Sequence, residues 1–134
     1  MGLRVTILFD NNAYDDRLET GWGFSCLVEG PELTVLFDTG ADSAILLRNM
    51  QRLGIDPQQV DAVVISHVHD DHLGGLAGFL KENSAVTVYL PQSFPESAKQ
   101  ATREAGAELV EVKEPVRICE HVHTTGETGE AIIE

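Results

Sequence analysis

The chain has 134 residues, of which 43% are hydrophobic, 6% aromatic and 23% charged. This length and composition predict a single globular domain and exclude collagen, a disordered polyelectrolyte and a disulfide scaffold. Acidic residues outnumber basic ones by 22 to 9, which gives a formal net charge of -13, so we expect neither nucleic acid nor an anionic membrane surface as a partner.

The N-terminal part has the two-residue period of β-strands. Apolar residues predict three strands there, at 3–9, 24–29 and 33–37. Gly30 and Pro31 mark a turn between the second and the third. We therefore expect these strands to lie close together in one sheet.

After residue 40 the period becomes helical. Apolar residues recur at helical spacing between 46 and 53, which predicts a helix of about a dozen residues that ends at Gly54. A short turn or helix at Asp56 and Pro57 follows. The run of apolar residues at 62–65 is typical of a central strand that is buried on both faces.

The C-terminal part continues the alternation of helices and strands. We expect a helix at 73–80, a strand at 86–90 and a helix at 93–105, with Ser93 and Glu96 as the capping box of that last helix. Short strands complete the chain, at 109–112, 116–118 and 122–124. This order predicts an α/β or α+β fold with helices packed on at least one face of a sheet.

The sequence also predicts a cytoplasmic location. The apolar stretch near the N-terminus is too short for a signal peptide, and no window approaches the ~20 apolar residues of a membrane helix. Cys26 and Cys119 are too few and too distant for a secreted disulfide framework. Cys26 lies in an apolar run and is expected to be a buried, inert thiol.

A cluster of histidines and aspartates directly follows the strand predicted at 62–65. It comprises His67, His69, Asp71 and His72, at the carboxyl end of that strand, where open α/β sheets place ligands. Residues 67, 69 and 71 share parity, so an extended backbone can aim them at one point. Imidazole and carboxylate groups are ligands for zinc, and also for iron and manganese.

One ion cannot easily take four ligands from so short a segment, whereas two neighbouring ions can share them. We expect His67 and His69 on one ion, and Asp71 and His72 on the other. Asp70 has the opposite parity and is expected to be exposed. The competing interpretation is a solvated loop that binds no metal.

The sequence HVHDDHLGG at 67–75 resembles the signature of the metallo-β-lactamase superfamily. The sequence LFDTG at 36–40 resembles the strand-end aspartate motif of the same superfamily. FDNN at 9–12, GWGFS at 21–25 and TTGE at 124–127 are similar to the branch that includes dihydropterin-ribofuranosylaminobenzene phosphate synthases.

The resemblance implies the N-terminal half of an αββα sandwich, with a mixed sheet and helices on one face of it. It also implies a hydrolase that uses a metal-activated water on an ester or phosphoester-like substrate, with one or two Zn²⁺ ions, or with iron or manganese instead. By this resemblance Asp71 is both a metal ligand and the proton acceptor nearest the water. Asp38 would orient a ligand histidine through its other ring nitrogen. The alternative for Asp38 is a turn residue that caps the next helix.

The later metal ligands of the superfamily have no match in this sequence. We therefore expect residues 1–134 to be one domain that is either truncated or a half-domain, or that forms a symmetric homodimer. His121 and His123 could replace the missing ligands, but a partly exposed strand is the favoured interpretation. The apolar segment at 131–133 is expected to be covered by other polypeptide.

Two functions from different classes remain open, and whether the chain is an enzyme depends on the supply of the missing ligands. The first is a metal-dependent hydrolase with a small-molecule substrate, phosphorylated or pterin-like. Asn11, Asn12 and Trp22 could line its pocket, although both asparagines also suit plain turns. The alternative is a catalytically incompetent half-domain that acts as an assembly or interaction module. A nuclease is disfavoured by the net charge of -13.

Overall fold

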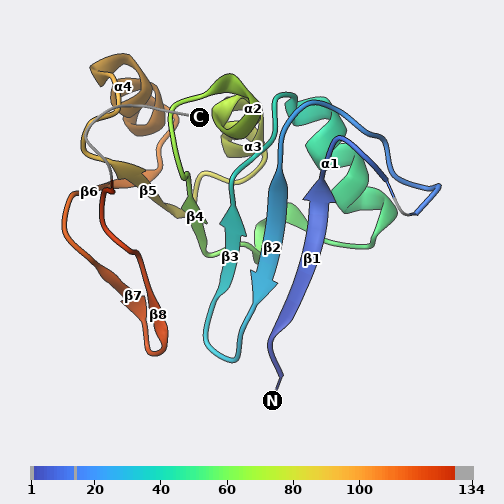
Figure 1. Cartoon of the computed structure of the whole chain (residues 1–134), viewed down its shortest axis with the longest axis horizontal. Helices are drawn as coiled ribbons and strands as arrows, with labels where there is room; N and C mark the ends of the chain where they lie inside the picture. The colour runs from blue at the N-terminus through green and yellow to red at the C-terminus, as the bar shows by residue number, and fades with distance from the viewer. Residues whose placement is uncertain (1, 14, 129–134) are drawn as a thin grey trace.

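The computed structural model describes residues 2–13 and 15–128, and Figure 1 shows their arrangement. Its elements are, in chain order, β1 (Arg4–Phe9), β2 (Ser25–Glu29), β3 (Thr34–Phe37), α1 (Ser43–Arg52), the 3-10 helix η1 (Pro57–Gln59), β4 (Ala62–Val64), α2 (Asp70–Leu73), α3 (Leu76–Glu82), β5 (Thr87–Pro91), α4 (Glu96–Glu104), β6 (Glu108–Val112), β7 (Arg117–Cys119) and β8 (Val122–His123). This succession confirms the predicted α/β class.

The main sheet is mixed, with the strand order β1-β2-β3-β4-β5-β6. Strands β1, β2 and β3 pair in antiparallel fashion, whereas β3, β4, β5 and β6 run parallel. Parallel strands end at the same edge of a sheet, so the segments after β3 and β4 emerge side by side. The LFDTG motif at 36–40 and the HVHDDHLGG motif at 67–75 therefore meet at that edge.

One face of the sheet carries the helices. In the central strands, alternate residues point to this side and are fully buried, as for Leu27, Leu36 and Val63. These side chains share one apolar core with residues of α1 and α3, such as Leu46 and Phe79. Burying a side chain of this size contributes roughly 1.5–3 kcal/mol, so this core holds the helices on the sheet.

The opposite face of the sheet, here called the open face, is only partly covered. Val35, Ala62, Tyr89 and Val112 form a smaller apolar cluster there, against which Ile118 of β7 packs. Figure 1 shows β7 and β8 as a hairpin beside the β6 end of the sheet.

Towards β1 the open face is exposed to solvent in the described part of the chain. Val5 pairs with Val28, and Ile7 pairs with Cys26, so these side chains share the open face. Val5 is 55% exposed and Ile7 is 44% exposed.

Cys26 is buried, as predicted, and burial raises the pKa of its thiol.

Two expectations for the helices are wrong in detail. The helix expected at 73–80 is instead the pair α2 and α3. The helix expected at 93–105 begins only at Glu96, and its N-cap is Pro95, with no side-chain capping bond. Ser93 therefore forms no capping box, because the chain at Pro95 is still extended.

None of the described helices is long and apolar enough to cross a membrane.

Candidate metal centre

The cluster predicted to bind metal lies just beyond β4. His67 and His69 belong to the loop after this strand, and Asp71 and His72 lie on the single turn of α2. One donor atom from each of His67, His69 and Asp71 lies within 4.8 Å of the other two, and all three residues are half-buried. The structure thus brings together three of the four predicted ligands at distances that one cation can span.

His72 lies beside this group. Its ring centroid is 4.1 Å from that of His67, and its Nε2 is 3.5 Å from Oδ2 of Asp71. Asp71 is thus close to His72 and also groups with His67 and His69, and the division of the four residues between two ions stays a prediction. Asp70 is exposed, as expected from its parity.

Asp38 follows β3 and is 1% exposed. Its Oδ2 accepts a hydrogen bond from Nδ1 of His72 at 2.7 Å and another from Oγ of Ser66 at 2.7 Å. Its Oδ1 accepts from the backbone N–H of Ser66 at 2.7 Å. Because a carboxylate only accepts, Nδ1 of His72 carries the hydrogen and Nε2 keeps its lone pair for a ligand. Helix α1 is capped by Asp42, so Asp38 is not a helix cap.

The backbone of Asp38 has a φ of 57°, which is uncommon for a residue other than glycine. Its N–H donates to the Val64 carbonyl at 2.8 Å, and its own carbonyl accepts from Oγ of Ser25 at 2.7 Å. These contacts hold the residue in a left-handed conformation that costs roughly 1–3 kcal/mol. Such a cost at a buried carboxylate is typical of a functional position.

Close backbone contacts fix helix α2 against the segment after β3. Both the N–H and the Oγ1 of Thr39 donate to the His72 carbonyl, at 2.8 and 2.9 Å. A Cβ on Gly75 would lie 2.3 Å from the Thr39 carbonyl oxygen. Glycine is therefore needed at the end of the HVHDDHLGG motif so that the ligand-bearing turn can lie on its neighbour.

A third segment reaches the site from the loop between β1 and β2. The N–H of Phe24 donates to the Asp71 carbonyl at 3.2 Å. Gly23 has a φ of 124°, and a Cβ there would lie 1.9 Å from the same carbonyl oxygen. The role of Gly23 was not predictable from the sequence, because its close approach to Asp71 depends on tertiary structure.

We expect Gly23→Ala to displace the backbone of Asp71. The added methyl group overlaps the Asp71 carbonyl and also forces an unfavourable φ, so the free energy of unfolding should fall by about 1–3 kcal/mol. Zinc affinity, measured by titration, should fall with it. Gly54→Ala is the matched control, since Gly54 also has a positive φ of 72° but has no atom within 4 Å of an added Cβ. Equal zinc affinity of the two variants would contradict this role for Gly23.

The electrostatic environment favours a neutral His67. Burial lowers the pKa of His67 below its usual 6.5, and nearby His72 lowers it further. Only a neutral imidazole offers a lone pair to a cation, so this direction suits a metal ligand.

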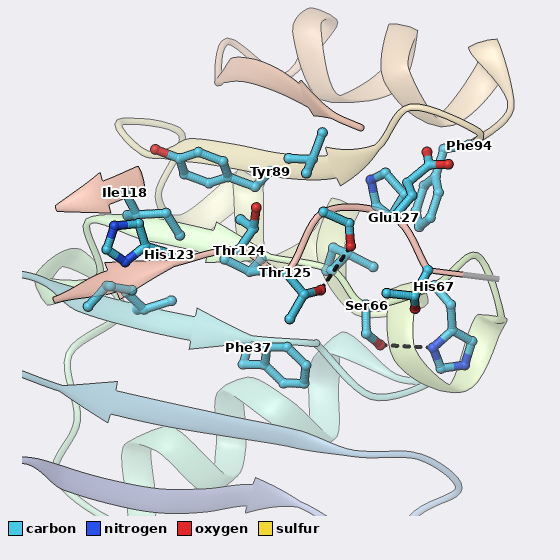
Figure 2. A pocket seen from close by; sticks show the side chains of 18 of the residues that line it. Phe37, Ser66, His67, Tyr89, Phe94, Ile118, His123, Thr124, Thr125 and Glu127 are labelled. Atoms are coloured by element: carbon cyan, nitrogen blue, oxygen red, sulfur yellow. Dashed lines mark hydrogen bonds between the residues drawn. The ribbon is translucent and has the colours of Figure 1, made fainter. Parts of the chain in front are cut away.

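A cavity of about 720 Å³ lies between the open face and the β7–β8 hairpin. Figure 2 shows Ser66 and His67 at one end of it, and Tyr89, Ile118 and His123 at the other. Its walls are largely apolar, and Glu127 contributes a carboxylate near the His67 end.

Several candidate residues do not join the group of His67, His69 and Asp71. Asn11, Asn12 and Trp22 do not line the cavity: Oδ1 of Asn11 accepts a bond from the Gly23 N–H, and Trp22 is 71% exposed. His121 and His123 do not belong to the cluster around His67. The segment 131–133 lies outside the described residues.

A strand-end cluster of imidazoles and carboxylates, on a mixed sheet with helices on one face, defines a candidate site for a divalent cation. Residues 22–131 match the model of the metallo-beta-lactamase superfamily, and the chain belongs to this superfamily.

Comparison with individual proteins agrees with this assignment. The 7,8-dihydropterin-6-methyl-4-(beta-D-ribofuranosyl)-aminobenzene-5'-phosphate synthase of Methanocaldococcus jannaschii is 28% identical over 144 residues, which cover 91% of this chain and 49% of that protein. Ribonuclease Z of Nanoarchaeum equitans is 32% identical over 68 residues, which cover 46% of this chain and 21% of that protein. A metallo-beta-lactamase fold protein from Bacillus subtilis superposes with a TM-score of 0.66 at 17% identity, over 86% of this chain and 49% of that one. The chain thus spans at most about half the length of each.

Proposed function

We propose that this chain is the metal-binding part of a zinc-dependent hydrolase that acts on an ester or phosphoester. The observation that carries the proposal is the convergence of His67, His69 and Asp71 within 4.8 Å, with His72 beside them. The donor set fits zinc, which prefers nitrogen and carboxylate oxygen ligands. Iron and manganese accept the same donors.

The residues of the chain have distinct tasks in this proposal. A bound cation would lower the pKa of a water molecule and polarise the substrate oxygen. His67 and His69 would hold one cation and His72 would hold a second, and Asp38 keeps Nε2 of His72 available by accepting its Nδ1 hydrogen. Asp71 would also ligate, and its carboxylate would accept the proton of the attacking water.

We further propose a small, phosphorylated or pterin-like substrate. The relative from Methanocaldococcus jannaschii has a name that describes a pterin-containing phosphate ester, and its similarity extends over 91% of this chain. The net charge of -13 supports a small substrate over a polynucleotide, because an acidic surface repels a phosphate backbone.

The two free cysteines support a reducing, cytoplasmic location as part of this proposal.

Zinc binding is the first test of this proposal. We expect the purified protein to hold at least one equivalent of zinc by elemental analysis, and a chelator to remove it. Because binding to the folded state alone stabilises it, zinc at a hundred times its dissociation constant should add about 2.7 kcal/mol to the free energy of unfolding. Folded protein that takes up no zinc, iron or manganese would refute the metal-dependent function.

The open face supports a second candidate function, an assembly module whose partner is a second copy of the chain. Val5, Ile7 and Val28 continue the apolar cluster around Val35 out to the edge strand β1. These side chains are uncharged, so this face allows two acidic copies to approach each other. A two-fold contact would bury the same patch on both copies.

Mass in solution tests this second candidate. We expect a dimer by light scattering, and a monomer for the double variant Val5→Glu, Ile7→Glu. Arg4→Glu is the control, since Arg4 is exposed on the same strand with its side chain on the other side. A monomeric wild-type protein, or a dimer that persists in the double variant, would refute assembly through this face.

A further inference from the structure

We infer that Ser66 is a positioning residue: its hydroxyl connects Asp38 to His67 and fixes which ring nitrogen of His67 faces the metal site. The inference rests on the proposed metal-dependent function, and it adds Ser66 to the residues of the site that were predicted from the sequence. Ser66 lies between β4 and the first histidine of the cluster.

Three contacts define the geometry around Ser66. Its Oγ lies 2.7 Å from Oδ2 of Asp38 and 2.8 Å from Nδ1 of His67. Its backbone N–H donates to Oδ1 of the same carboxylate at 2.7 Å. Figure 2 shows the contact between the hydroxyl and the His67 ring at the end of the cavity. The hydroxyl is thus held between a buried carboxylate and an imidazole.

The direction of these hydrogen bonds follows from the groups that make them. A carboxylate only accepts, so the single hydrogen of the Ser66 hydroxyl is donated to Asp38. The lone pairs of Oγ then remain as acceptors, and Nδ1 of His67 must be the donor. A neutral His67 with its hydrogen on Nδ1 has its lone pair on Nε2, the nitrogen that is free to ligate.

One buried carboxylate therefore orients two histidines of the site. Asp38 accepts directly from Nδ1 of His72, and it acts on Nδ1 of His67 through the hydroxyl of Ser66. Both rings then offer Nε2. Without the hydroxyl, Nδ1 of His67 would lose this acceptor, and the ring would be free to rotate or to carry its hydrogen on Nε2.

The position of Ser66 makes it suitable for substitution. The residue is exposed, so removal of its hydroxyl leaves no buried hole, and its backbone bond to Asp38 persists in any variant other than proline. Ser66→Ala deletes the hydroxyl, whereas Ser66→Thr keeps it. Ser97→Ala, on the exposed side of α4, is a matched control for loss of a serine hydroxyl.

The first measurement is the ¹⁵N spectrum of the imidazoles in metal-free protein near neutral pH. We expect the wild type and Ser66→Thr to carry the His67 hydrogen on Nδ1, and Ser66→Ala to lose this preference. The spectrum of His72 should not change in any of the three, because its own bond to Asp38 is direct. A wild-type His67 with its hydrogen on Nε2, or a Ser66→Ala spectrum identical to that of the wild type, would overturn the inference.

The second measurement is a zinc titration. We expect Ser66→Ala to bind zinc 10–100-fold more weakly than the wild type, as for other residues that orient a ligand, with Ser66→Thr and Ser97→Ala close to the wild type. Equal affinity of Ser66→Ala and the wild type would also overturn the inference. If the wild type binds no metal at all, the proposed function fails, and the metal-free spectra still decide the role of Ser66.

Discussion

Replacement of Asp71 by alanine is expected to abolish metal-dependent hydrolysis. The change removes a predicted metal ligand and the predicted proton acceptor at once, and the loss of a general base alone typically costs 10²–10⁴-fold in rate. Zinc content should also fall, because the donor group of His67, His69 and Asp71 loses its carboxylate. The measurements are kcat for a phosphoester substrate and zinc per chain by elemental analysis.

Asp70→Ala provides the matched control for this prediction. Asp70 is adjacent in sequence, has the same side chain and lies on the same turn of α2, but it is exposed and outside the candidate metal group. We expect its zinc content and turnover to stay within twofold of the wild type. Unchanged metal content and turnover in Asp71→Ala would remove Asp71 from the site.

The residue types of the cluster and its place at the sheet edge were predictable, because the apolar strand β4 sets the direction in which the chain reaches that edge. The alternation of residues 67, 69 and 71 is only part of the geometry, since Asp70 and Asp71 lie on the turn of α2 and not in extended backbone. No knowledge of the remaining strands is needed for these inferences.

The environment of Asp38 was not predictable by this route. Its contacts with Ser66 and His72 depend on the parallel pairing of β3 with β4, which aligns Phe37 with Val64 and brings the two strand ends together. Strand order and register are properties of the whole sheet, and a single sequence does not determine them. The resemblance to a known family supplied a role for Asp38, whereas the hydrogen bonds to Ser66 required the structure.

The error at the start of α4 has a local cause. Ser93 and Glu96 have the spacing of a capping box, but Pro95 lies between them. Proline disfavours a helical conformation in the residue before it, so the helix begins after Pro95 instead. The N–H of Ser93 donates instead to the Glu127 carboxylate, a contact between residues 34 positions apart.

Asp38→Asn is expected to weaken zinc binding 10–100-fold while the fold is retained. Asparagine has nearly the same shape and tolerates the left-handed backbone at φ 57°. Its amide, however, has one acceptor oxygen where the carboxylate had two. In the wild type Oδ1 accepts from the Ser66 N–H, and Oδ2 accepts from both the Ser66 hydroxyl and Nδ1 of His72. The backbone N–H can only donate and so keeps the amide oxygen opposite it, which leaves the NH₂ in the place of Oδ2, facing the hydroxyl and the imidazole.

An NH₂ group that faces His72 would donate to Nδ1 and move the ring hydrogen to Nε2, the nitrogen needed for the metal. Imidazole ¹⁵N spectra of the metal-free variant report this change directly. Asp38→Ala should lose affinity as well and also unfold more easily, by about 1–3 kcal/mol, because the groups of Ser66 and His72 that donate to the carboxylate lose their acceptor. Asp42→Asn is the control, because asparagine is an equally good cap for α1 and Asp42 has no contact with the histidines. If Asp38→Asn bound zinc as tightly as Asp42→Asn, the carboxylate would be structural only, and the orientation of His67 and His72 would have to come from the metal itself.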